Sequence, residues 1–137
     1  MTAPDFNVPD IVGDPPDLGG KVCNALISER LFHNGELYAE ANVIYLKADE
    51  TWHRLFLDVG IVHWRPQDHA PQPFAVTQED LLHSHFDIAE DAGLIGVPFS
   101  SYDMQANEAG CSVTFHFKNG RRVVFDESMD KTRYAVI

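Results

Sequence analysis

The sequence contains only two cysteines and no apolar run long enough to cross a membrane. Cys23 and Cys111 are too few for a disulfide scaffold, and we expect both to be buried thiols. No uninterrupted apolar run approaches the roughly 18 residues that span a bilayer. The first residues, MTAPDFNVPD, lack the basic and apolar segments of a secretory signal. These absences together predict a soluble protein of the cytoplasm.

Cations are missing from a long part of the chain. The net charge is −11, with 21 Asp and Glu against 10 Lys and Arg, and residues 66–117 contain no Lys or Arg. The acids of this region are Asp68, Glu79, Asp80, Asp87, Glu90, Asp91, Asp103 and Glu108. A solvated face that keeps the protein soluble is one interpretation, but solubility does not require bases to be excluded from one region. The sign of the charge disfavours binding to nucleic acids and anionic membranes.

The length and the positions of Pro and Gly predict one domain with an N-terminal arm. A chain of 137 residues fits a single core. The first twenty residues contain four Pro and three Gly, which exclude a regular helix or a central strand there. We therefore predict an acidic arm or tail over residues 1–20 and a globular domain over residues 21–137.

Period-two alternation predicts an antiparallel hairpin after this arm. The first strand carries on one side Leu37, Ala39, Ala41, Val43 and Tyr45. The second strand, after a polar turn at 47–51, carries on one side His53, Leu55, Leu57 and Val59. Gly60 then predicts a bulge that returns Val62 and Trp64 to the face of Val59. Asp58, beside Gly60, is interpreted as a turn residue rather than a functional carboxylate.

Two Asn-Gly pairs predict tight turns, because both central residues of a type I′ turn need positive φ. The segment before Asn34-Gly35, residues 21–33, fits a strand or a helix that ends at Gly35, and we favour the strand. Asn119-Gly120 joins two strands whose register has two solutions. A two-residue turn pairs Phe115 with Val124, whereas a bulge at the turn brings Val123 and Phe125 opposite the phenylalanines.

Two capping patterns predict short helices within the cation-free region. They are Thr77-x-x-Asp80 and Asp87-x-x-Glu90, the second with Gly93 as its stop. The flanking segments supply the sheet. The predicted fold is therefore α+β, a mostly antiparallel sheet that is β-roll or half-barrel like, with one or two short helices.

The segment LLHSHFDIAEDAGLIG contains two His in the pattern His-x-His and a following Glu. His83, His85 and Glu90 resemble part of the first motif of the cupin family, in which two His on one strand and a later Glu hold a divalent metal. The resemblance implies a small metal-dependent enzyme. Thr77 stands where that family has Gly, and no second cupin motif precedes His116. We predict no cofactor and no catalytic residues, and the cupin-like metal enzyme is the alternative.

The favoured function is the recognition of a basic protein. The acids of residues 66–117 would steer such a partner, and exposed aromatic residues between them would anchor it. The predicted contact residues are Asp68, Glu79, Asp80, Asp87, Glu90, Asp91, Phe99, Tyr102, Asp103 and Glu108. Phe74 is a further candidate anchor, and a place in the core is the alternative for each aromatic residue.

Three segments carry a resemblance to a known group of proteins. These are GELYAEANVIYLKADETWHRLFLDVGIVHWR, the acidic segment that ends in GLIG, and the KNGR hairpin. Across roughly residues 20–126 they resemble the small acidic immunity proteins of bacterial contact-dependent and related polymorphic toxin systems. The resemblance implies a non-enzymatic inhibitor that binds a toxin domain encoded by a neighbouring gene, often a basic nuclease, and blocks its active site or substrate-binding surface. It implies no site residues, because the group has many unrelated folds, and we expect a monomer or a weak dimer.

Overall fold

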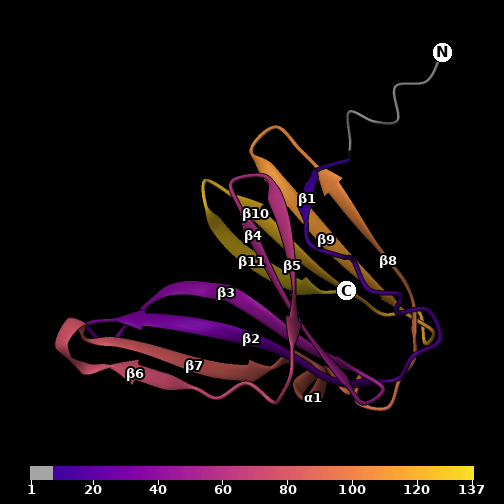
Figure 1. The fold of residues 1–137 in the computed structure, drawn as a ribbon, viewed down its shortest axis with the longest axis horizontal. Coiled ribbons are helices and arrows are strands. Elements are labelled where there is room, and N and C mark those ends of the chain that lie inside the picture. Colours follow the sequence, from indigo (N-terminus) through magenta and orange to yellow (C-terminus); the bar gives the residue numbers. More distant parts are fainter. Residues whose placement is uncertain (1–7) are drawn as a thin grey trace.

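Two β-sheets make up the protein (Figure 1). The computed structural model describes residues 8–137. The first sheet has the strand order β1-β5-β4-β3-β2-β7-β6, and the second has the order β11-β10-β9-β8. The strands are β1 (Asp10–Val12), β2 (Cys23–His33), β3 (Glu36–Ala48), β4 (Thr51–Asp58), β5 (Ile61–Gln67), β6 (Phe74–Val76), β7 (Leu81–Asp87), β8 (Phe99–Ala106), β9 (Gly110–Phe117), β10 (Arg122–Ser128) and β11 (Lys131–Val136). A 3-10 turn, η2 (Thr77–Glu79), and a short helix, α1 (Ile88–Ala92), flank β7.

The predicted fold class is confirmed. Strands make up 64% of the described residues, and neither sheet closes on itself. The parallel pairing of β1 with β5 is the exception in an otherwise antiparallel arrangement. The segment before Asn34 is the strand β2, as favoured. None of the helices between residues 8 and 137 is long and apolar enough to cross a membrane.

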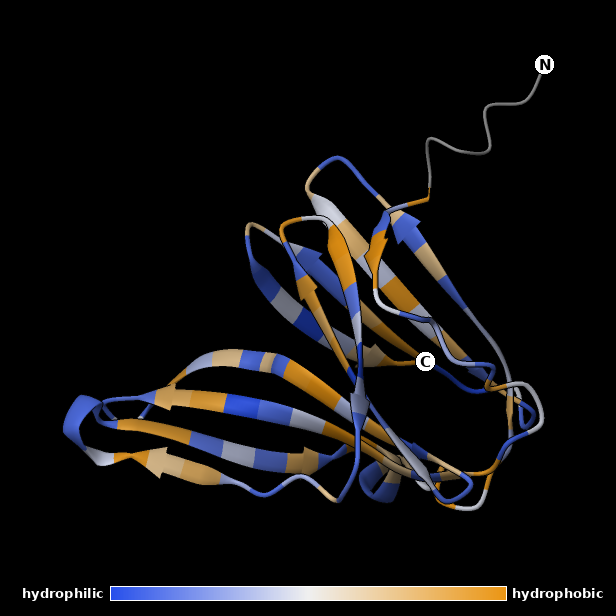
Figure 2. Cartoon of the chain, in the orientation of Figure 1, coloured by the Kyte–Doolittle hydropathy of each residue, from blue (hydrophilic) through white to orange (hydrophobic). Residues whose placement is uncertain are grey.

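The core lies between the two sheets. On β4 the alternation of the strand turns Leu55 and Leu57 inward, and the pairing with β5 places Trp64 beside Leu55. The second sheet contributes the buried rings of Phe115 and Phe125. Burying a large apolar side chain contributes about 1.5–3 kcal/mol relative to leaving it exposed. The hydropathy pattern in Figure 2 shows the resulting alternation of polar and apolar positions along the strands.

The β4–β5 connection differs from the prediction. Val62 and Trp64 share the inner face with Leu57, as predicted. Val59 and Gly60, however, form a two-residue turn between paired Asp58 and Ile61, and no bulge lies there. Val59 is therefore exposed at a hairpin tip and does not belong to the core face.

Strand β3 buries the opposite face from the predicted one near its C-terminal end. Ile44 and Leu46 are fully buried there, whereas Val43 and Tyr45 are only half-buried. The pairing with β2 is irregular between Ala39 and Val43, where β3 advances four residues while β2 advances two. This irregularity changes which side chains point inward, so the alternation that starts at Leu37 does not continue through the strand.

Strands β2 and β3 continue beyond the two-sheet core. Because β4 pairs only with residues 44–48 of β3, the first half of β3 pairs with β2 alone, and β7 and β6 complete the sheet there. We call this part, residues 29–43 and 74–86, the sheet extension. It points to the left in Figure 1. Its tip is the turn at Asn34 and Gly35, both of which have positive φ, as a type I′ turn requires.

The second Asn-Gly hairpin adopts the bulged register. Val123 lies opposite Phe115, which is the second of the two solutions. Only Gly120 of the Asn-Gly pair has positive φ. The connection is therefore longer than a two-residue type I′ turn, and the left-handed glycine supplies the bulge.

The described part of the N-terminal arm is attached to the domain. Strand β1 is an edge strand, as expected for a segment rich in Pro, while Leu18 is buried in the core. The hydroxyl of Tyr102 donates a hydrogen bond to the carbonyl of Pro16 at 2.6 Å. A Cβ atom at Gly13 would overlap the carbonyl of Trp64, so only glycine lets these two backbone segments pass so closely. The prediction of an arm also covers residues 1–7, which lie outside the described residues.

One of the two predicted helix starts is correct. The Asp87 carboxylate accepts the N–H groups of Ala89 at 3.0 Å and Glu90 at 3.2 Å and so caps α1. Gly93, with φ of 71°, ends this helix as predicted. Thr77 makes no capping hydrogen bond, and the turn that follows Val76 is only the three-residue η2.

Candidate protein-binding surface

The acids of the cation-free region do not form one surface. Glu79 and Asp80 lie between β6 and β7 at the tip of the sheet extension, and Asn34 bonds to the Asp80 carbonyl there. Glu108 lies in the turn between β8 and β9, far from that tip in Figure 1. Glu90 lies on α1, apart from both. The structure thus separates residues that the sequence places in one segment.

The remaining predicted acids are also dispersed. Asp68 is exposed after β5, and Asp91 is exposed on α1 beside Glu90. Asp87 has a structural role, because it also accepts the N–H of Leu26 at 3.2 Å. Asp103 on β8 pairs with a ring nitrogen of His116 at 2.8 Å. These positions correct the expectation of one continuous acidic face.

The predicted aromatic anchors have different positions. Phe99 is fully buried and packs on other core rings, so its prediction as an exposed contact is wrong. Tyr102 is half-buried, with its ring 5.5 Å from that of Trp64. Phe74 is 51% exposed and stacks on His83 with ring centroids 4.0 Å apart. Only Phe74 has the exposure that a contact anchor needs.

The structure does not assemble the cupin-like site. His83 and His85 alternate with Ser84 on β7 and share a face, as predicted, but the carboxylate beside His83 is Glu29. Glu29 is buried on β2, and its Oε1 lies 2.9 Å from Nδ1 of His83. Glu90 is exposed on α1. Among residues 8–137 no group of three or more His, Cys, Asp or Glu is placed to hold a metal ion.

Both thiols are buried, as predicted. Burial raises the pKa of Cys23 and of Cys111 to about 12, because desolvation disfavours the thiolate. Both side chains are therefore protonated at neutral pH. A nucleophilic cysteine needs thiolate character, which neither residue has.

Three turns that are distant in the sequence meet at one end of the two-sheet core. We call residues 58–60, 107–110 and 127–130 the turn end. The N–H of Gly60 donates to Oε1 of Glu127 at 2.6 Å, and the N–H of Met129 donates to the carbonyl of Ala109 at 3.5 Å. The corresponding connections, β4–β5, β8–β9 and β10–β11, lie together in the upper part of Figure 1. The turn end is thus one continuous surface.

A buried carboxylate holds the turn end together. Glu127 is fully buried and accepts the N–H of Asp130 at 3.0 Å in addition to that of Gly60. The thiol of Cys111 lies 3.7 Å from the same carboxylate. Backbone donors of this kind offset the cost of burying an ionised group. A Cβ atom at Gly110 would overlap the carbonyl of Glu127, so this close approach also requires glycine.

Two exposed carboxyl groups at the turn end contact each other. The side chains of Asp58 and Asp130 are hydrogen-bonded, and this bond raises the pKa of Asp130 above its ordinary value. Smaller contributions come from desolvation and from the charges of Asp58 and Glu127. Two carboxyl groups share a hydrogen bond only while one of them keeps its proton. When that proton is lost, two like charges lie side by side at this surface.

The same turns expose apolar side chains. Val59 is 68% exposed and Met129 is 90% exposed. Val59 has a φ of 46°, which is unusual for a β-branched residue, and Met129 has a φ of 52°. Exposed apolar residues in strained backbone cost stability, and such costs concentrate at functional sites. The turn end therefore combines negative charge with apolar tips.

The protein's own cations neutralise few of its acids. Within residues 8–137 the ion pairs of carboxylates with Lys or Arg comprise Lys47–Glu50 alone, at 3.6 Å. Two further carboxylates pair with histidines. The exposed acids of the turn end, Asp58, Glu108 and Asp130, thus have no ion-pair partner among these residues.

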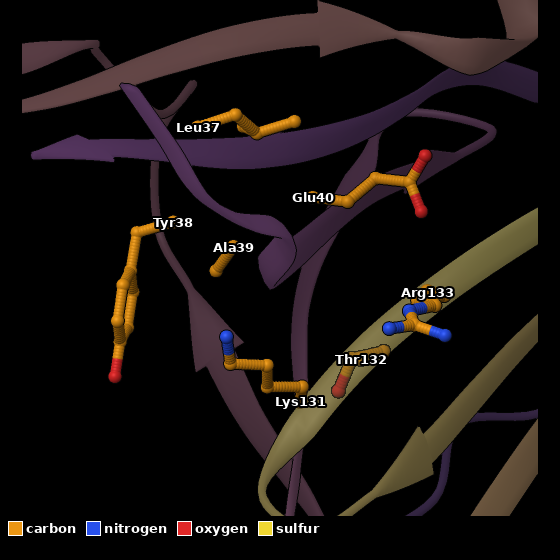
Figure 3. A pocket seen from close by; sticks show the side chains of 7 residues that line it. All are labelled: Leu37, Tyr38, Ala39, Glu40, Lys131, Thr132 and Arg133. Carbon is orange, nitrogen blue, oxygen red and sulfur yellow. The ribbon is translucent and has the colours of Figure 1, made fainter. Parts of the chain in front are cut away.

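Basic residues gather at a different place. A crevice of about 300 Å³ lies between β3 and β11, and Lys131 and Arg133 line it together with Tyr38 and Glu40 (Figure 3). The Lys131 ammonium lies 4.7 Å from the centre of the Tyr38 ring, a cation–π contact. None of the ten predicted contact residues lines this crevice.

No protein-family model matches this chain, and neither a curated protein nor a solved structure is significantly similar to it. The class of the protein therefore follows from its own architecture, a two-sheet α+β fold with mostly antiparallel strands. Sequence reasoning missed the turn end because its residues come from three separate segments. The one available signal was Asp58 beside Gly60, which marks a turn without showing what the turn meets.

Proposed function

We propose that this chain is a non-enzymatic binding protein of the cytoplasm that neutralises a basic protein, a toxin domain of nuclease type, by covering its active or substrate-binding surface. The turn end is the observation that carries the proposal. It presents Asp58, Glu108 and Asp130 without ion-pair partners around the exposed side chains of Val59 and Met129. A partner that fits it carries Lys and Arg around an apolar pocket.

Two physical effects support this assignment. An acidic surface steers a basic partner and raises association rates by about 10- to 1000-fold. Most binding energy, however, comes from a few desolvated anchors, which Val59 and Met129 can supply. Burial of these tips in a partner would also recover the stability that their exposure costs. The net charge of −11 adds to the steering.

The test uses the proteins encoded by the two genes next to this one. Each is mixed with the full chain, and the association rate is measured by stopped-flow fluorescence at increasing NaCl. The proposal expects one of the two proteins to bind, at a rate that falls steeply with salt. It also expects the bound protein to stop cell growth when it is expressed alone and to be harmless when it is expressed with this chain.

Two matched variants locate the surface. The first combines Asp58→Asn, Glu108→Gln and Asp130→Asn at the turn end. The control combines Glu36→Gln, Glu79→Gln and Asp80→Asn, which removes three exposed acids from the tip of the sheet extension. The turn-end variant should associate at least tenfold more slowly than the control. Equal association rates for the two variants would show that only the net charge matters and that the turn end is not the binding surface. If neither protein from the adjacent genes binds this chain, the proposal is refuted.

A further inference from the structure

Arg54 and Arg65 lie directly opposite each other on β4 and β5. They alternate with Leu55 and Trp64 of the core and therefore project from the outer face of the first sheet. Directly opposite residues on neighbouring antiparallel strands have Cβ atoms about 4.5–5.5 Å apart, and two like charges at such a pair are destabilising. The chain has 21 Asp and Glu against 10 Lys and Arg, so a carboxylate opposite either arginine would be a common arrangement. The pairing of two cations needs an explanation.

Neither arginine of this pair has an ion-pair partner among residues 8–137. Neither Arg54 nor Arg65 has a carboxylate oxygen within 4.0 Å of its guanidinium nitrogens. The Nε atom of Arg54 is buried and has no hydrogen-bond partner. Native proteins leave few buried donors unpaired, and each exception calls for a physical explanation such as strain or a ligand that accepts the hydrogen bond.

Other unpaired polar atoms lie on the same face. His63 precedes Arg65 by two residues on this face of β5. Its ring stacks on that of Phe56 with centroids 4.4 Å apart, and both of its ring nitrogens are buried without a partner. Tyr45, on β3, lies opposite Arg54. The ring of His85 is 5.7 Å from that of Tyr45, and its Nε2 is buried without a hydrogen-bond partner. Four of the six buried unpartnered side-chain atoms of residues 8–137 therefore belong to the outer face of this sheet.

We infer that Arg54 and Arg65 form a binding site for a phosphate group. Guanidinium groups donate two parallel hydrogen bonds to phosphate oxygens, and two of them match the charge of a phosphate dianion. The phosphate supplies the negative charge that no carboxylate supplies within 4.0 Å, and it offsets the repulsion between Arg54 and Arg65. Trp52 and Phe56, which flank Arg54 on this face of β4, offer rings on which a flat group attached to the phosphate can stack. This site is independent of the turn end and of the proposed toxin partner.

Inorganic phosphate is the first probe. The melting temperature of the full chain is measured in increasing phosphate at pH 7.5, with NaCl added to keep the ionic strength constant. Because a ligand that binds only the folded state stabilises it by mass action, phosphate should raise the melting temperature progressively and saturably. An equal effect of NaCl alone would show that salt merely screens the repulsion and would overturn the inference.

Matched variants separate binding from stability. Arg54→Gln removes one cation, so the unliganded protein should melt at the same temperature as the natural protein or higher, and the shift with phosphate should disappear. Arg65→Gln provides the same test at an exposed position if Arg54→Gln does not fold. Arg122→Gln, an exposed arginine on β10 of the second sheet, is the control and should keep the full shift. Retention of the phosphate shift by Arg65→Gln would overturn the inference.

A second probe distinguishes the free anion from a phosphate ester. Phenyl phosphate carries the same dianion and a flat ring, and its affinity is compared with that of inorganic phosphate by calorimetry. Tighter binding of phenyl phosphate, lost in Trp52→Ala while phosphate binding remains, supports an aromatic phosphate ester as the ligand. Equal affinities support the free anion. Absence of binding by both probes overturns the site.

Discussion

The carboxylate of the fully buried Glu127 accepts the N–H of Gly60 at 2.6 Å and thereby joins the second sheet to the turn of the β4–β5 hairpin. The two residues are 67 positions apart in the sequence. Because the same carboxylate also accepts the N–H of Asp130, a single side chain fixes two of the three turns of the turn end.

Glu127→Ala should be strongly destabilising. The substitution removes the buried acceptor of two partly buried N–H groups, those of Gly60 and Asp130, and we expect a loss of about 2–4 kcal/mol in the free energy of unfolding. Urea denaturation followed by tryptophan fluorescence measures it. The control is Glu50→Ala, whose side chain is 89% exposed and which should cost less than about 0.5 kcal/mol. A similar loss in both variants would show that the buried carboxylate does not hold the turns.

The Asp58–Asp130 contact predicts a specific dependence of stability on pH. Its hydrogen bond raises the pKa of Asp130 in the folded state above the unfolded value. The contribution of this pair to stability is therefore complete below the unfolded pKa and is lost as the pH rises through the folded pKa. Asp58→Asn keeps a hydrogen-bonding side chain but removes one charge, so it should remove that loss.

Unfolding by urea at several pH values between about 4 and 8 tests this expectation. Asp58→Asn should gain stability relative to the natural protein as the pH rises through the carboxyl range. Glu79→Gln removes one exposed charge at the tip of the sheet extension, away from the turn end, and is the control variant for the change in net charge. A constant difference between Asp58→Asn and the natural protein across this range would contradict the shared proton.

Local signals in the sequence predicted most of the fold. Alternation placed Leu55 and Leu57 on the core side, and the Asp87-x-x-Glu90 pattern located the start of α1. These predictions succeed because each depends on neighbours in the chain. The predicted buried face of β3 near Ile44 was wrong, because the irregular pairing with β2 changes which alternate residues of β3 point inward. No residue type in the sequence marks that change.

The candidate surface could not be predicted in the same way. The segment 66–117 lacks cations, but its strands belong to both sheets, and this separates Glu79 from Glu108. The turn end exists only because β4, β9 and β10 are brought together by long-range packing. Asp130 lies in a segment with more bases than acids, so a sum of charge along the chain hides it.

Phe99 and Phe74 should respond in opposite ways to truncation. Phe99 is fully buried, so Phe99→Ala should cost about 3–5 kcal/mol of unfolding free energy through the lost contacts and the cavity. Phe74 is 51% exposed on the edge strand β6, and Phe74→Ala should cost about 1 kcal/mol or less, including its stacking on His83. Urea unfolding measures both losses. A small effect of Phe99→Ala would mean that this ring does not pack in the core.

Val59→Asn should separate stability from binding. Asparagine tolerates the positive φ at this position far better than a β-branched residue, so the substitution should raise the free energy of unfolding by about 0.5–1 kcal/mol. The same change removes an apolar tip and should weaken the binding of the basic partner about tenfold, mainly through faster dissociation. Thermal unfolding and stopped-flow dissociation measure the two effects. Met129→Asn, at the other apolar tip, should likewise raise stability and speed dissociation. If the Val59→Asn protein is stabilised but dissociates from the partner at an unchanged rate, Val59 is not an anchor.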